Sequence, residues 1–149
     1  MSAKLIAIES ASVRDIIRVC STSGNWVLTM AIVHFKGVVE SLTRELIPKI
    51  YLARIRDDEG KYLVEMDLHE ELFVVPKGAK VEFSISREKP EYRDGIDFLG
   101  RATFVTKRRI DEHNQYLFSI GGLLVIVTTK EELDVKPVEK VYVKLAQIG

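Results

Sequence analysis

Strict alternation of apolar and polar side chains marks the stretch VPKGAKVEFSIS, residues 75–86. Val81, Phe83 and Ile85 would share one face of an extended chain, because successive side chains of a strand point to opposite sides. The residues in front of them predict a turn, since proline fixes φ and glycine adopts positive φ without strain. The stretch therefore predicts a turn followed by a half-buried strand over residues 79–86.

The same two-residue period recurs along most of the chain. It predicts further strands at residues 32–39, 49–56, 62–68, 98–106, 115–120, 123–127 and 141–145. The acidic segment 57–60 would close a hairpin, and 87–97 and 107–114 are expected loops. Residues 123–127 are apolar throughout, which predicts a strand covered on both sides or one that passes through the centre of a small barrel. Short strands separated by glycine, proline and charged turns favour an all-β fold, an antiparallel barrel or sandwich.

The leader, residues 1–29, follows a different pattern. Apolar side chains recur at i, i+3, i+4 and i+7 from Val13 to Cys20, behind Ser12 as a candidate N-cap, which predicts one short helix. The sequence from Met30 to Val33 then reads like the beginning of a protein chain. The compact domain is predicted over residues 30–149. The leader is either a genuine extension or a stretch upstream of the true start.

Composition excludes several classes of function. The chain has 149 residues, 46% hydrophobic and 30% charged, and its 22 Lys and Arg balance 22 Asp and Glu. A net charge of zero argues against proteins that hold nucleic acid or anionic membranes mainly by charge. The single cysteine excludes an internal disulfide and a zinc site built from thiolates. The longest uncharged run, 114–129, is shorter than the roughly 20 residues of a membrane helix. We expect a soluble cytoplasmic protein that does not enter membranes.

The sequence contains no recognisable set of catalytic side chains. His34, His69 and His113 lie on different segments, and neither a phosphate-binding glycine loop nor a serine nucleophile motif is present. His69 lies among three carboxylates that could form an oxygen-rich metal site, but a solvated acidic hairpin end is the favoured interpretation. We predict no catalytic residue, no metal, no cofactor and no small-molecule substrate.

One basic run stands out, Lys107-Arg108-Arg109. It could contact phosphate or an acidic protein, and nearby aromatic residues could form a stacking surface of the kind used by oligonucleotide-binding barrels. However, Phe98 and Phe104 share the parity of core-facing positions. A solvated loop or a protein interface is therefore favoured for this candidate contact patch.

The C-terminal third carries the most specific motif. It reads Ser119-Ile120-Gly121-Gly122-Leu123-Leu124 and, after an acidic loop, Val141-Tyr142. This order resembles the end of the eighth subunit of eukaryotic RNA polymerases and of its archaeal counterpart. Gly100 looks like the glycine of the family's aromatic-x-Gly strand. The resemblance covers about residues 30–145, with departures at Ile120, where eukaryotic members have an aromatic, and at Ala79, where an acidic residue is usual.

The resemblance implies an eight-stranded antiparallel barrel of the OB type. It also implies a non-catalytic subunit of DNA-directed RNA polymerase that docks on the largest subunit and supports assembly or stability, with nucleic acid contacted only weakly or indirectly. The alternative is a free OB-type barrel that binds single-stranded RNA or DNA. The family signature would be structural: Gly100, Gly121, Gly122, Leu123, Leu124, Val141 and Tyr142.

Two further expectations concern single residues. Two adjacent glycines in an apolar strand predict a sharp bend with another backbone close by, so that Gly121→Val or Gly122→Val would disrupt the barrel. Exposed Tyr51, Tyr92 or Tyr142 could anchor an interface with the polymerase, because tyrosine is enriched at protein contacts.

Overall fold

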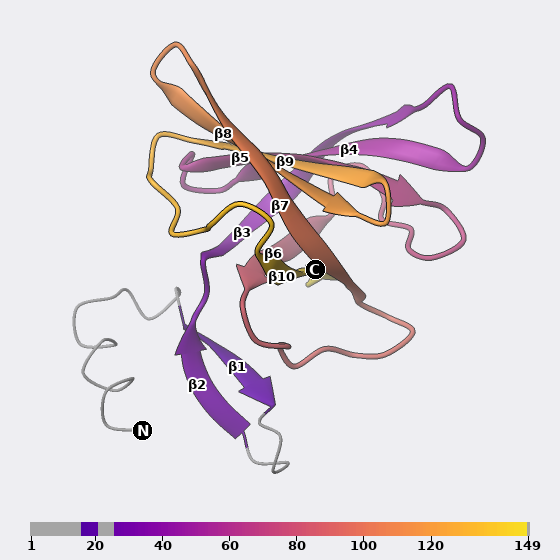
Figure 1. The fold of residues 1–149 in the computed structure, drawn as a ribbon. Coiled ribbons are helices and arrows are strands. Elements are labelled where there is room, and N and C mark those ends of the chain that lie inside the picture. The colour runs from indigo at the N-terminus through magenta and orange to yellow at the C-terminus, as the bar shows by residue number, and fades with distance from the viewer. Residues whose placement is uncertain (1–15, 21–25, 149) are drawn as a thin grey trace.

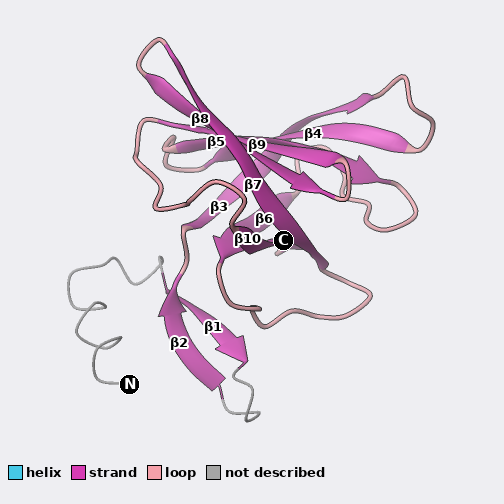
Figure 2. Cartoon of the chain, in the orientation of Figure 1, coloured by secondary structure: helices cyan, strands magenta, loops and turns pink. Residues whose placement is uncertain are grey.

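The structure, a computed structural model, describes residues 16–20 and 26–148. This part of the chain contains ten strands and no helix (Figures 1 and 2). The strands are β1 (Ile16–Cys20), β2 (Trp26–Met30), β3 (Val33–Arg44), β4 (Ile50–Asp57), β5 (Tyr62–His69), β6 (Lys80–Ser86), β7 (Phe98–Ile110), β8 (His113–Ile120), β9 (Leu123–Thr129) and β10 (Lys140–Gln147). Within these residues no helix is long and apolar enough to span a membrane.

Strands β3 to β10 close into one barrel. Their order around it is β10-β6-β3-β4-β5-β9-β8-β7, and β7 returns to pair with β10. Each neighbouring pair is antiparallel, while β1 and β2 form a separate two-stranded sheet. The predicted all-β fold, an antiparallel eight-stranded barrel, is confirmed.

The apolar side chains of the alternating strands fill the barrel interior. Val81, Phe83 and Ile85 of β6 are completely buried, as their spacing predicts. The Phe83 ring lies 5.4 Å from that of Phe35 on the neighbouring strand β3. Each such side chain contributes about 1.5–3 kcal/mol by leaving water, so the shared inner face is the main source of stability.

Two hairpins run past the ends of their neighbours β6 and β10, while β4 stays paired with β5 and β8 with β9. Strand β3 pairs with β6 only as far as Val38 but continues beside β4 to Arg44, and we call residues 40–54 the β3–β4 arm. Likewise β7 pairs with β10 as far as Thr103 and continues beside β8 to Ile110, so residues 105–117 form the β7–β8 arm. Figure 1 shows the two arms leaving the barrel in different directions.

The structure corrects two of the predicted elements. Residues 16–20 form strand β1, paired with β2, so the predicted helix is wrong there, and its residues 12–15 lie outside the described residues. The β-branched residues of that stretch favour a strand over a helix. Residues 107–114 are not a loop, because β7 and β8 remain paired through the arm and leave only Asp111 and Glu112 as the turn. The domain boundary near residue 30 remains a prediction.

Strand β9 is covered on one side only. Val125 and Val127 are buried in the barrel, but Leu124 points outward and is 41% exposed. Strand β9 lies in the barrel wall between β5 and β8, so both expectations, cover on both sides and passage through the centre, are wrong within this chain. An antiparallel barrel buries its inner face and leaves its outer face to solvent or to a partner.

Candidate functional site

The basic run lies on strand β7 within the β7–β8 arm, not in a loop. Lys107 pairs in register with Tyr116 and Arg109 with Asn114, both of which face inward, whereas Arg108 pairs with the outward-facing Gln115. Successive side chains of a strand point to opposite sides, so the three cations are divided between two faces. The structure does not bring them together as one patch.

Partners within the chain already engage two of these cations. The Lys107 ammonium contacts the Glu132 carboxylate and lies 5.6 Å from the centre of the Tyr116 ring. The hydrogen bond between Lys107 and Glu132 raises the pKa of Lys107 and lowers that of Glu132. Arg108 Nη2 donates to Gln115 Oε1 at 2.9 Å. The arm is thus less available to phosphate than its sequence indicates.

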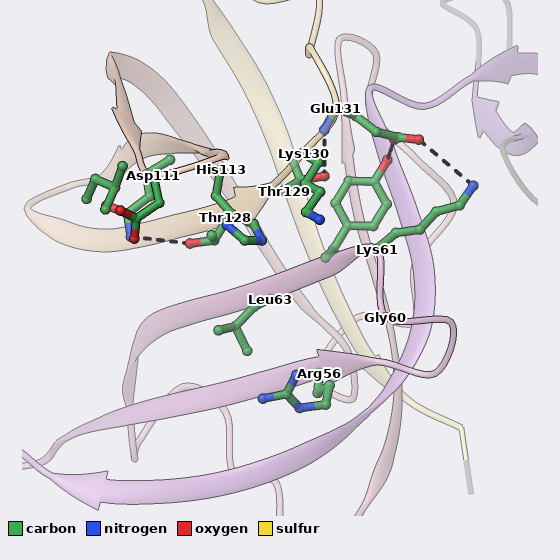
Figure 3. Close-up of a pocket in the computed structure, with 13 residues that line it drawn as sticks. Arg56, Gly60, Lys61, Leu63, Asp111, His113, Thr128, Thr129, Lys130 and Glu131 are labelled. Atoms are coloured by element: carbon green, nitrogen blue, oxygen red, sulfur yellow. Dashed lines mark hydrogen bonds and ion pairs between the residues drawn. The ribbon is translucent and has the colours of Figure 1, made fainter.

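A concavity of about 590 Å³ lies beside this arm (Figure 3). Its wall carries both signs of charge, with Lys61 Nζ 3.9 Å from Glu131 Oε1. The Tyr62 hydroxyl donates to Glu131 Oε2 at 2.7 Å, and Gln115 Nε2 donates to Thr128 Oγ1 at 3.4 Å. These polar groups bind one another across the wall. They do not include a nucleophile held by a base.

At the acidic end of β5, His69 and the carboxylates beside it bind other groups of the chain. His69 Nδ1 accepts the backbone N–H of Glu71 at 3.2 Å. The carboxylates beside it contact cations, Glu71 with Lys49 at 2.5 Å and Glu70 with Arg44 at 3.8 Å. No group of three or more His, Cys, Asp or Glu within the described part of the chain is arranged to hold a metal ion.

Gly121 and Gly122 form the two-residue turn between β8 and β9. Their φ angles are +57° and +97°, and the flanking Ile120 and Leu123 pair across the turn. Positive φ at both positions is the requirement of the type I′ hairpin turn. The expected close approach of another backbone is wrong, since no heavy atom outside each glycine and its two chain neighbours lies within 4 Å of a Cβ added there. The need for glycine here is conformational.

Close packing occurs instead at Gly100, on the inner face of β7. A Cβ added there would lie 3.0 Å from Ile120 Cγ2 of β8. Val141 is completely buried and pairs with Ala102, whereas Tyr142 lies half-buried on the outer side opposite Ser86. The signature residues are therefore distributed over β7 to β10 as parts of the barrel, not gathered at one site.

Two features of the surface and the strands went unrecognised in the sequence. Leu46 and Ile47 are exposed at the tip of the β3–β4 arm, although two aliphatic residues between two predicted strands are a visible signal. Gly37 interrupts the alternating strand β3 at an inward-facing position, which is typical of a close backbone approach.

Comparison with known proteins assigns the chain to a family. The family model for RpbG, a subunit of DNA-directed RNA polymerase, matches residues 32–148. DNA-directed RNA polymerase subunit Rpo8 of Sulfolobus acidocaldarius is 29% identical over 97 residues, covering 64% of this chain and 78% of that protein. A structure of the cytoplasmic molybdate-binding protein ModG has 18% identity and a TM-score of 0.31, covering 78% of this chain and 91% of that one, a likeness too low to indicate a shared function. The chain belongs to the RpbG family of DNA-directed RNA polymerase subunits.

Proposed function

We propose that this chain is a non-catalytic accessory subunit of archaeal-type DNA-directed RNA polymerase, which docks on the largest subunit and supports assembly or stability of the enzyme. The observation that carries the proposal is the family match over residues 32–148, which spans all eight strands of the barrel. The Sulfolobus relative supports the archaeal type. We expect the chain in the cytoplasm, bound to the polymerase.

The surface chemistry suits a protein partner better than nucleic acid. The chain has equal numbers of basic and acidic residues, so it lacks the positive excess that phosphate neutralisation requires. A permanent protein partner is held by shape and apolar contact, which need no net charge. A barrel with aliphatic side chains such as Leu124 on its outer face offers contact of that kind.

Purification of the affinity-tagged full chain from its own cells, in high salt and with nuclease, tests the proposal. High salt removes loosely held charged partners but leaves a docked subunit in place. Mass spectrometry is expected to identify the large polymerase subunits in amounts close to that of the tagged chain. An unrelated tagged protein from the same cells serves as the control.

The alternative function, a free OB-type barrel that binds single-stranded nucleic acid, predicts a different result. The chain would then be recovered alone, or with RNA that nuclease removes. Cross-linking of the purified polymerase separately tests the largest subunit as the docking partner, and cross-links confined to other subunits would contradict that part of the proposal.

A further inference from the structure

Exposed aliphatic side chains gather at one end of the molecule. Four of the five most exposed large hydrophobic residues within 31–148 lie there, on two loops. Leu46 and Ile47 form the tip of the β3–β4 arm, and Leu72 and Val74 lie in the loop between β5 and β6. We call these four residues, with the groove described next, the apolar end. Aliphatic side chains left in water contribute nothing to folding, which points to burial by a partner.

A groove of about 580 Å³ lies between the strands of the β3–β4 arm, the end of β5 and the β5–β6 loop. Its apolar wall comprises Leu42, Tyr51, Leu68, Phe73, Val75 and Pro76, together with Val74. These residues give an apolar lining with room for a large aliphatic or aromatic side chain.

The two loops are held together before any partner binds. The N–H of Glu70 donates to the carbonyl of Lys49 at 2.9 Å, which connects the β5–β6 loop to the base of the tip. Phe73 and Val75 are buried, whereas Leu72 and Val74, which alternate with them, are directed outward and are each 71% exposed. Ordering already present in the free chain lowers the entropic cost of docking.

The charges around the groove indicate the chemistry of its occupant. Among the described residues that line it, only Glu70 and Glu71 are charged. Glu71 is paired with Lys49 at 2.5 Å and Glu70 with Arg44 at 3.8 Å. The carboxylates are therefore compensated within the chain, and a charged partner would lose its hydration without gaining a counter-ion. The complementary partner is apolar and uncharged.

We propose that the apolar end is the surface by which this chain docks on the polymerase, and that its occupant is an apolar, uncharged segment of a larger polymerase subunit. One side chain of that segment enters the groove, while Leu46, Ile47, Leu72 and Val74 pack around it. The inference rests on the proposed function and adds the surface and the chemistry of the partner. Because apolar contact dominates, attachment is insensitive to salt.

The variant Leu46→Ser/Ile47→Ser tests the proposal in the full chain. Tagged variant and untagged wild type are expressed together in the native host, and their ratio in purified polymerase is measured by mass spectrometry. The variant is expected to be retained about tenfold less than wild type, as for loss of an interface hot spot. Ile96→Ser is the matched control, since Ile96 is 61% exposed on the 87–97 loop and is expected to be retained like wild type. Equal melting temperatures of the free variants exclude unfolding as the cause.

A photo-reactive benzoylphenylalanine at position 46, 72 or 96 provides the second measurement. Cross-links from positions 46 and 72 to one segment of a larger subunit, with none from 96, support the proposal. Cross-links from 46 and 72 to RNA or to a second copy of the chain overturn it. Retention of Leu46→Ser/Ile47→Ser at the wild-type level also overturns it, while leaving the proposed function intact. Failure of the wild-type chain to purify with polymerase contradicts the proposed function itself.

Discussion

Gly37 and Arg56 meet so closely that a Cβ at Gly37 would lie 2.2 Å from the carbonyl oxygen of Arg56. Gly37 faces the interior from β3 and pairs with Asp57 of β4, two residues before the bulge between Val39 and Ser41. The obstructing atom belongs to the backbone of a paired strand, so it cannot swing aside as a side chain would. The contact lies where the pairing of β3 with β4 begins, ahead of the β3–β4 arm.

Gly37→Ala is therefore expected to destabilise the barrel by about 2 kcal/mol, the order found for overpacking a core. Urea unfolding of the free chain measures the change. Gly100→Ala is the matched control, because its added Cβ meets Ile120 side-chain atoms at 3.0 and 3.1 Å, which can shift. A Gly100 variant as destabilised as the Gly37 variant would contradict the distinction between backbone and side-chain obstruction.

Substitutions in the β8–β9 turn should act through backbone conformation. Gly122→Val places a β-branched residue at a φ of +97° and is expected to cost about 1–2 kcal/mol, like other left-handed residues with a Cβ. Gly121→Asn should change stability little, since asparagine adopts positive φ readily and φ at Gly121 is +57°. Thermal melting compares the two variants. Equal losses from both would indicate that space, not φ, requires glycine.

The 87–97 loop contributes a pH-dependent stability through Asp97. Its side chain is 2% exposed and receives Arg93 Nη2 at 2.8 Å and the Arg93 backbone N–H at 2.8 Å. Burial raises the pKa of Asp97, but the hydrogen bonds from Arg93 outweigh it and leave the pKa below its ordinary value. A carboxyl with a lowered pKa in the folded state stabilises above its unfolded pKa, about 4, and loses that contribution as the pH falls further.

Asp97→Asn should accordingly lower the melting temperature by several degrees at pH 7. The difference from wild type is expected to stay constant down to about pH 5 and to shrink below about pH 4, where Asp97 itself becomes protonated. Melting curves from pH 7 to pH 3 measure it. A difference that grows on acidification would contradict the sign of the pKa shift.

The free chain should bind single-stranded RNA weakly. Lys107 is engaged by Glu132 and the two arginines beside it lie on opposite faces of β7, so few phosphates can be neutralised at once. A ten-nucleotide RNA at 150 mM salt is expected to bind with a Kd above about 100 μM, at the weak limit of non-specific binding. Fluorescence anisotropy measures this. Tight binding that falls steeply with salt and disappears in Arg108→Gln/Arg109→Gln would contradict the prediction.

Tyr51 is the tyrosine expected to anchor the polymerase interface. It lines the groove of the apolar end, with the Arg44 guanidinium 4.6 Å from its ring centre. Tyr142 lies half-buried on the outer side of β10, and Lys89 lies over the ring of Tyr92. Tyr51→Ala should reduce retention in purified polymerase about tenfold. Tyr142→Ala and Tyr92→Ala should be retained like wild type, and loss of either would place the interface elsewhere.

Local patterns in the sequence were sufficient to predict that the strands of the barrel exist, but not how far β3 and β7 extend. Alternation placed β6 within one residue of its observed start, because a side-chain period of two depends only on the chain's own geometry. The sequence predicts that the Gly121-Gly122 pair is needed by the barrel, but the predicted reason, the close approach of another backbone, is wrong. Its role depends on whether the chain reverses there, and reversal is decided by the pairing of β8 with β9.

By itself, the sequence determined an all-β chain, the inward and outward faces of its strands and the resemblance to a polymerase subunit. Only the tertiary structure decided that Lys107, Arg108 and Arg109 divide between two faces, since the bulge beside Phe104 and the pairing with β8 set their directions. It also brought Leu46 and Leu72 to one end of the molecule through the hydrogen bond between Glu70 and Lys49. Side-chain periods are local, whereas the gathering of distant loops depends on strand pairings that no single stretch of sequence contains.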